Sequence, residues 1–325
     1  MQSLQAFLLC LKRTQFIDER DMAMTISKQR RFRANASKRR STLNGLRLEQ
    51  LEDRRLLATY ADVVLADSPL AFYEFNEGTG TNTLDSTGNA NTGNFVGAPT
   101  YVTGRTGLAG DTALDFTPGN RVDITTAATA FDSISTTTDQ VTVEMWGFGD
   151  PAAQPRTNTS FNLGNGAGNR VAFAHMPWND NRIYWDAGIG AGGGSRLSTL
   201  VSTTQTEGRW NHYVFVKDGT TNFSGMYING ELVASLNSST DAFANPSFLR
   251  IAENHDGMLD DISVYDQALS AAQVTAHYEA GFVNANDDDY TGSNPITEDQ
   301  TLVISDGAND LVANDSNEFR HFDLN

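Results

Sequence analysis

The sequence predicts an all-β fold, a sandwich or jelly roll of two antiparallel sheets with one short helix near its C-terminal end. Between Tyr60 and Phe282, short apolar segments alternate with turns rich in Gly, Asn, Asp and Thr, a spacing typical of such sandwiches. In the segment YINGEL, Asn229 and Gly230 suit a type I′ hairpin turn, which needs positive φ at both positions. Residues 256–274, DGMLDDISVYDQALSAAQV, indicate a last strand followed by a capped helix.

Other segments combine apolar, β-branched and aromatic residues in the manner of strands. In chain order they are LAFYEF (70–75), TALDF (112–116), QVTVEMW (140–146), RVAFAH (170–175), RIYWDA (182–187), HYVFVKD (212–218), GMYING (225–230), ELVASL (231–236) and SFLRIA (247–252). Their number and short spacing support the all-β class.

The last strand, residues 258–265, contains two adjacent aspartates. Period-two alternation places Asp260 on the face of the apolar Ile262 and Val264 and puts Asp261 on the opposite face. We therefore expect Asp260 to point inward and Asp261 outward. A carboxylate that faces a core is costly unless backbone amides, a cation or a metal satisfy it.

The helix that follows has clear local signals. Ser270 is the expected N-cap, Gln273 completes a capping box, and Leu269 with Val274 forms a hydrophobic staple. Gly281 is expected to end the helix, where a left-handed backbone would be needed.

Charge divides the chain unevenly. The net charge is −17, but residues 1–58 contain 13 Lys and Arg against 6 Asp and Glu. We expect three parts: a basic head (1–58), a β domain (60–282) and a short C-terminal part (284–325). An acidic domain is a poor binder of nucleic acid because of like-charge repulsion.

Cys10 is the only cysteine, so a disulfide framework is excluded. The apolar run AFLLCL, residues 6–11, is far shorter than the roughly 18 residues that a membrane-spanning helix needs. We therefore expect no membrane span.

The β domain resembles a known family over about 220 residues. The segments YEFNEGTG, LDSTGNANTG, ALDF, VTVEMW, RWNHYVFVKDG, MYINGELV and DGMLDDISVYDQALSAAQV occur in the order found in LamG-like jelly-roll domains of the concanavalin A-like lectin and glucanase superfamily. The resemblance implies that the last strand and helix close the sandwich, with Asp260 at the family's inward acidic position.

The flanking parts resemble segments of bacterial surface proteins. LRLEQLEDRRLLA, residues 46–58, is similar to the LEPR-XLL motif, from which it departs at Asp53. Residues 286–315 resemble the start of a cadherin-like or immunoglobulin-like repeat, of which too little is present to fold as a complete sandwich. These resemblances imply a bacterial protein that is secreted or held at the cell surface. The alternative for residues 46–58 is a short amphipathic helix without a targeting role.

Catalysis is the first alternative to binding, because the superfamily includes glycosidases. Retaining members place paired glutamates on one strand as E-x-D-x-E or E-x-D-x-x-E, and no such string occurs here. Glu144 stands alone in its strand. Two carboxylates from separate strands remain an alternative, since separation in space decides the chemistry. The five histidines show no metal-ligand spacing, and each is expected to be a surface or packing residue.

Calcium is the cofactor hypothesis. The loop LDSTGNANTG offers oxygen donors from Asp85, Asn89 and Asn91, and Asp260 adds a carboxylate that needs a partner. The alternative for the loop is that these side chains cap turns through hydrogen bonds to the backbone. For Asp260 the alternative is pairing with backbone amides.

Sugar binding requires a flat apolar surface edged by hydrogen-bonding groups. Trp178 is the candidate, because it lies in a polar loop after a predicted strand. The polar neighbours expected to bind ligand with it are Asn179, Asp180 and Asn181. Trp146 and Trp210 lie in the matched segments VTVEMW and RWNHYVFVKDG and are expected in the core. The alternative is that Trp178 also packs into the core.

The sequence thus favours an exported, non-enzymatic recognition module that binds a glycan or an extracellular protein. The alternatives are a concanavalin-like glycoside hydrolase and a structural spacer domain. An exposed aromatic side chain or a metal at the rim would indicate a binding module. Two carboxylates in an open cleft would indicate a hydrolase. A domain with neither feature would be a spacer.

Overall fold

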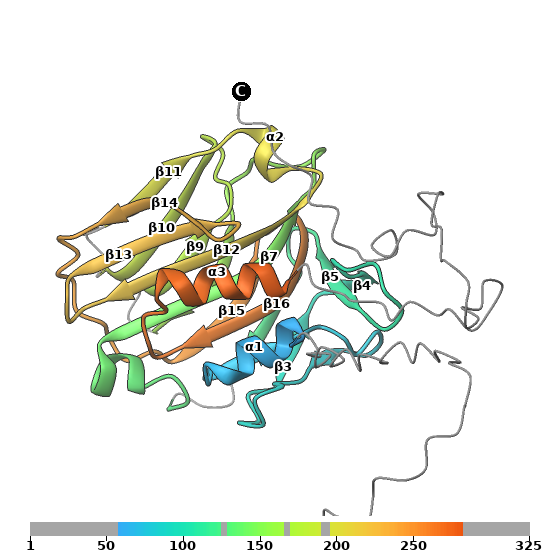
Figure 1. Ribbon diagram of the computed structural model, residues 1–325. Coiled ribbons are helices and arrows are strands. Elements are labelled where there is room, and N and C mark those ends of the chain that lie inside the picture. Colours follow the sequence, from blue (N-terminus) through green and yellow to red (C-terminus); the bar gives the residue numbers. More distant parts are fainter. Residues whose placement is uncertain (1–57, 125–128, 166–169, 190–195, 282–325) are drawn as a thin grey trace, which may run out of the picture. The chain divides into compact units, whose positions relative to one another are not determined.

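The computed structural model describes residues 58–124, 129–165, 170–189 and 196–281. These residues form two antiparallel sheets that pack face to face, with few helices (Figure 1). The predicted all-β jelly-roll class is confirmed. The basic head and the C-terminal part lie outside the described residues, so the motif and repeat expected there stay predictions.

The first sheet has the order β14-β13-β12-β7-β16-β5-β4, and β1 pairs with β16. Its strands are β1 (Ala71–Tyr73), β4 (Thr100–Thr103), β5 (Thr112–Phe116), β7 (Gln140–Gly149), β12 (Trp210–Asp218), β13 (Phe223–Ile228), β14 (Glu231–Leu236) and β16 (Gly257–Tyr265).

The second sheet has the order β11-β10-β9-β8-β15-β6-β3-β2. Its strands are β2 (Asn82–Thr83), β3 (Gly93–Val96), β6 (Arg121–Ile124), β8 (Thr159–Gly164), β9 (Arg170–His175), β10 (Arg182–Ile189), β11 (Leu197–Leu200) and β15 (Phe248–Glu253). The strands that the sequence analysis missed are short or rich in Thr and Asn, and include β2, β3 and β8.

Within the described residues, four helical segments accompany the sheets. They are α1 (Tyr60–Ala66), the π-helix η1 (Ile134–Thr138), α2 (Thr203–Thr206) and the C-terminal α3 (Ala271–Ala280). The predicted capping box of α3 is present, because the Ser270 hydroxyl accepts from the Gln273 amide and the Gln273 side chain accepts from the Ser270 amide. Helix α1 was not predicted from the sequence, although Thr59 and Asp62 form a capping box at its start. In the described part of the chain, no helix is long and apolar enough to cross a membrane.

Apolar side chains gather in two layers. The larger core fills the space between the sheets and includes Val143, Phe161, Trp185, Phe215 and Ile262. The smaller core lies between the outer face of the first sheet and helices α1 and α3, and includes Tyr60, Val64, Trp146, Val214 and Val274 (Figure 1). The first sheet is therefore buried on both faces, and polar residues on its outer face have to find partners inside the protein.

The side-chain orientation predicted for the two aspartates of β16 is wrong. The register with β7 shifts between Asp260 and Ser263, and Asp261 adopts a φ of 48°. This bulge breaks the period-two alternation. Asp260 pairs across the strands with Trp146. Its side chain therefore lies on the helix-covered face of the first sheet, as that of Trp146 does, and not in the core between the sheets. Asp261, expected to be solvent-exposed, is only 6% exposed.

The structure confirms the backbone conformation predicted for one glycine, Gly230, and corrects the one predicted for another, Gly281. Asn229 and Gly230 have φ values of 52° and 79°, which confirms the predicted hairpin turn. Gly281 has a φ of −63°, so the left-handed end expected for α3 is wrong. A Cβ at Gly281 would collide with the Trp146 ring, and close packing is therefore the reason for this glycine.

Candidate functional site

The outer face of the second sheet presents polar and aromatic side chains from β9 and β10. Trp185 and Ala187 point into the core, so Tyr184 and Asp186 lie on the opposite, outer face. Cross-strand pairing places Phe173 beside Asp186 on that face. These positions form the centre of the candidate site.

Asp186 anchors the site. Its carboxylate is fully buried and accepts two hydrogen bonds from Arg196, Nε to Oδ1 and Nη2 to Oδ2, each at 2.6 Å. Arg170 Nη1 also donates to Oδ2, and His175 Nε2 lies 3.6 Å from the same oxygen. Burial alone would raise the pKa of Asp186, but the hydrogen bonds from His175 and Arg196 and the charges of both arginines hold it well below its usual value. Asp186 therefore stays ionised.

The two arginines reach solvent while Asp186 does not. The side chains of Arg170 and Arg196 are 38% and 45% exposed. Each guanidinium also lies over an aromatic ring: Arg196 is 4.9 Å from the Tyr184 centroid, and Arg170 is 5.4 Å from that of Phe173. The site therefore offers oriented cations and aromatic surface together.

The β9–β10 hairpin brings the predicted ligand residues to this site. The partly buried Trp178 ring lies edge-on to His175, with centroids 4.8 Å apart, and to Tyr184 at 6.4 Å. Asp180 accepts a hydrogen bond of 2.6 Å from the Tyr184 hydroxyl. Trp178 and Asp180 thus belong to one cluster with Tyr184.

The other two predicted ligand residues lie in the turn between β9 and β10. Asn179 is exposed at the tip of the hairpin, and Asn181 adopts a φ of 61° in the turn. Three residues of the site were not predicted from the sequence: Arg170, Asp186 and Arg196. Alternation in RIYWDA could have placed Asp186 beside Tyr184 on an outer face, but only the sheet brings both arginines to it.

The predicted calcium residues lie in two separate places. Asp85 Oδ1 accepts from the Phe72 amide at 3.1 Å and the Thr87 amide at 3.0 Å, while Oδ2 accepts from Asn91 Nδ2 at 2.9 Å. The side-chain amides of Asn89 and Asn91 donate to the Leu70 carbonyl, at 3.1 and 3.2 Å. The loop is therefore organised by side-chain hydrogen bonds, as its alternative interpretation holds.

Asp260 accepts hydrogen bonds elsewhere, from the Arg105 amide at 3.3 Å and the Asp261 amide at 2.9 Å. In the described ranges, no group of three or more His, Cys, Asp or Glu side chains is arranged to hold a metal ion. Calcium at Asp85, Asn89, Asn91 or Asp260 stays a prediction.

We expect Asp85→Ala to lower the free energy of unfolding by about 1 to 3 kcal/mol, because several amide donors lose a charged acceptor. Chemical denaturation with calcium and with chelator would measure this. Asp132→Ala is the control, since the contacts of Asp132 with Ser135 and Thr136 are made by its backbone carbonyl. An Asp85→Ala defect that disappears in chelator would show that calcium, and not the turn, is responsible.

A second polar cluster lies under the helices, centred on Glu144 of β7. Tyr60 donates to Oε1 at 2.8 Å and Tyr265 to Oε2 at 3.0 Å. His212 Nε2 lies 2.6 Å from Oε1, and His277 Nδ1 lies 2.9 Å from Oε2. Since a carboxylate only accepts, both imidazole nitrogens donate.

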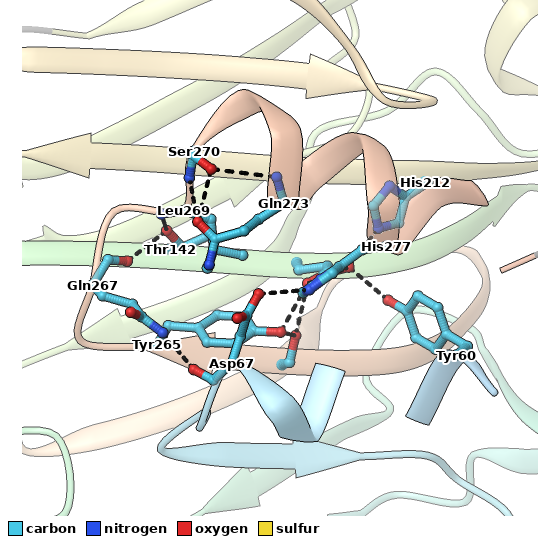
Figure 2. Close-up of polar contacts among 12 residues, drawn as sticks. Tyr60, Asp67, Thr142, His212, Tyr265, Gln267, Leu269, Ser270, Gln273 and His277 are labelled. Atoms are coloured by element: carbon cyan, nitrogen blue, oxygen red, sulfur yellow. Dashed lines mark hydrogen bonds and ion pairs between the residues drawn. The ribbon is translucent and has the colours of Figure 1, made fainter. Parts of the chain in front are cut away.

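The cluster joins several elements. In Figure 2, Tyr60 approaches from α1 and His277 extends from α3 toward Asp67, whose Oδ2 lies 3.0 Å from His277 Nε2. Burial would raise the pKa of Glu144, but hydrogen bonds from His212 and His277 hold it well below its usual value. The pKa of His277 is raised: burial opposes its charge, but Glu144 and Asp67 outweigh that effect.

This cluster is a structural one. Glu144, His212 and His277 are all fully buried, so a substrate does not reach them. The histidines were expected to be surface or packing residues, and their contact with Glu144 was not predicted. Their separation in the chain hides the cluster from any local pattern.

Neither ionised carboxylate described above suits a glycosidase acid. A general acid needs a raised pKa and access to the sugar. Glu144 is enclosed, and Asp186 lies beneath two arginines. The hydrolase alternative therefore gains no support from either residue.

Comparison with known proteins agrees with this fold. Residues 123–275 match the laminin G-type family model described as the concanavalin A-like lectin/glucanases superfamily. No curated protein sequence matches the chain.

Among solved structures, the receptor-binding domain of botulinum neurotoxin C/D mosaic serotype is similar, with 14% identity, a TM-score of 0.54, and coverage of 66% of this chain and 52% of that one. The binding domain of botulinum neurotoxin DC in complex with SialylT matches with 9% identity, a TM-score of 0.52, and coverage of 66% and 52%. The same domain in complex with rat synaptotagmin II matches with 8% identity, a TM-score of 0.52, and coverage of 67% and 53%.

This chain thus spans about half the length of the neurotoxin chains that it matches. At these identities the likeness shows the fold alone. Residues 123–275 are thus similar to the concanavalin A-like lectin/glucanases superfamily, and the solved structures share the sandwich fold of this domain.

Proposed function

We propose that this domain is a non-catalytic recognition module that binds a glycan on the outer face of the second sheet. The observation that carries the proposal is the cluster of Trp178, Tyr184 and Arg196 beside the buried Asp186. It combines aromatic surface with oriented hydrogen-bond donors, which is the combination that sugar recognition requires. Trp178 and Asp180 keep the roles expected from the sequence.

The similar structures are compatible with a binding role. The binding domain of botulinum neurotoxin DC is described in complex with SialylT and in complex with rat synaptotagmin II. An analogy of fold does not transfer a ligand, and an extracellular protein is the second candidate here. A spacer domain would not need the oriented arginines and rings.

Export to the cell surface or medium of a bacterium is part of the same proposal. It is supported by the motif in residues 46–58 and by the basic head that precedes it. N-terminal sequencing of the native protein would test it: a mature N-terminus after the motif supports export, and an intact head counts against it.

We expect Trp178→Ala to weaken glycan binding at least tenfold with little change in melting temperature, because the ring is partly exposed and packs on His175 and Tyr184. A glycan array followed by calorimetric titration, with calcium and with chelator, would measure this. Trp210→Ala is a matched control, since Trp210 is also partly buried but packs on Phe148 of the first sheet.

Unchanged binding by Trp178→Ala would refute the role of this residue, and a melted domain would show that it is core. Release of reducing sugars from a bound glycan would instead support the hydrolase.

A further inference from the structure

We infer that the ligand is an acidic glycan, whose carboxylate binds at the guanidinium groups of Arg170 and Arg196. The inference rests on the proposed function and specifies its ligand class. It follows from the charge, the geometry and the exposure of the site.

The site holds one more cation than its own carboxylates require. Arg196 alone contacts both oxygens of Asp186, and such a bidentate pair neutralises the carboxylate. Arg170 adds a second guanidinium to the same group. Including Arg182 and Asp180, the described parts of β9, β10, β11 and their hairpin contain three arginines and two aspartates, with Arg196 directly before β11.

The excess of positive charge is confined to this site, whereas the whole chain has a net charge of −17. Non-specific attraction of polyanions is therefore unfavourable, and an anion that binds does so through short-range contacts at this site. The buried carboxylate lies below and the half-exposed cations above it, so the positive groups are the ones that meet a ligand.

The arginines are also held in place before a ligand arrives. Asp186 fixes both, and the rings of Tyr184 and Phe173 support their flat faces. A guanidinium has five N–H donors in a planar fork that matches a carboxylate. Asp186 takes two from Arg196 and one from Arg170. Because the side chains are already ordered, little conformational entropy is lost on binding.

The outer face of the second sheet lacks such an excess of positive charge at its other end, on β6 and β15. There Arg121 pairs with Asp123 through Nε at 2.7 Å, and Arg250 pairs with Glu253 at 3.2 Å. Two arginines meet two acidic groups, so the charges balance. Arg121, whose side chain is 29% exposed, is therefore a matched control for the arginines of the site.

The test measures binding of oligogalacturonate, a chain of uronic acids, to the full chain by calorimetry. Its methyl ester, which keeps the sugar backbone and loses the charge, and a sulfated neutral oligosaccharide are the comparison probes. Arg170→Gln is the main variant, because it leaves the Asp186–Arg196 pair intact and should fold. We expect oligogalacturonate affinity to fall at least tenfold in Arg170→Gln and in Arg196→Gln, and to stay unchanged in Arg121→Gln.

The wild-type protein should bind the methyl ester at least tenfold more weakly than the acid. Equal affinity for acid and ester, or unchanged binding by Arg170→Gln with an unaltered melting temperature, would overturn the inference. Binding of the sulfated probe alone would overturn the choice of a carboxylate. If neutral glycans bind through Trp178 regardless of charge, the inference fails and the proposed function stands; if no glycan binds, both fail.

Discussion

Glu144→Ala is expected to lower the free energy of unfolding by about 3 to 5 kcal/mol, a large fraction of the roughly 5 to 15 kcal/mol that ordinary domains have. The substitution leaves the buried donors of Tyr60, His212, Tyr265 and His277 without their shared acceptor. These donors come from α1, β12, β16 and α3, so the packing of both helices on the first sheet depends on one carboxylate. Urea unfolding followed by tryptophan fluorescence would measure the change.

Glu253→Ala serves as the control. Glu253 is 30% exposed, pairs with Arg250 and accepts a hydrogen bond of 2.6 Å from Asn162, and its loss should cost about 1 kcal/mol. A Glu144→Ala protein as stable as the Glu253→Ala protein would contradict the structural role of the cluster.

The pH dependence of Glu144 has a definite sign. Because its pKa lies below the ordinary value of 4.5 in the folded protein, its contribution to stability is present above that pH and is lost on acidification. The isosteric variant Glu144→Gln lacks this contribution. The difference in unfolding free energy between wild type and Glu144→Gln should therefore be largest near neutral pH and shrink as the pH falls below 4.5.

Arg105→Met is the second substitution with a large expected effect, also about 3 to 5 kcal/mol. Arg105 Nε donates to Asp261 Oδ2 at 2.7 Å, and its backbone amide donates to Asp260. Its guanidinium lies 4.6 Å from the Tyr60 centroid and 4.7 Å from that of Trp146. Without Arg105, two adjacent buried carboxylates lose their cation. Arg121→Met should cost less than about 1 kcal/mol in the same urea titration.

Acid should partly rescue Arg105→Met. Burial raises the pKa of Asp261 to about 6 although Arg105 opposes the shift, and removal of Arg105 raises it further. A carboxyl group whose folded pKa is raised stabilises the fold at low pH and loses that contribution as the pH rises through the folded value. The stability of Arg105→Met should therefore increase relative to wild type between pH 7 and 5. A constant difference over that range would show that the lost packing, and not the charge, is responsible.

The positions of Asp260 and Asp261 also correct the side-chain orientation predicted for β16. Asp261 was expected to point outward. The bulge buries it against Arg105 instead. Strand alternation predicts a face only while the register with the neighbouring strand is continuous.

Local signals determined much of this protein. The strand segments, the Asn229–Gly230 turn and the Ser270 capping box follow from backbone preferences within a few residues, and the structure confirms them. The polar loop around Trp178, singled out in the sequence, lies beside Tyr184 in the candidate site.

Tertiary structure alone decided which distant side chains meet. His212 and His277 lie 68 and 133 residues from Glu144 in the chain, and Arg196 reaches Asp186 only because β10 turns back into β11. Gly281 is explained by the Trp146 ring and not by helix-end geometry. These contacts follow from burial, because a buried charged group has to find its partner among the groups that the fold brings within hydrogen-bonding distance.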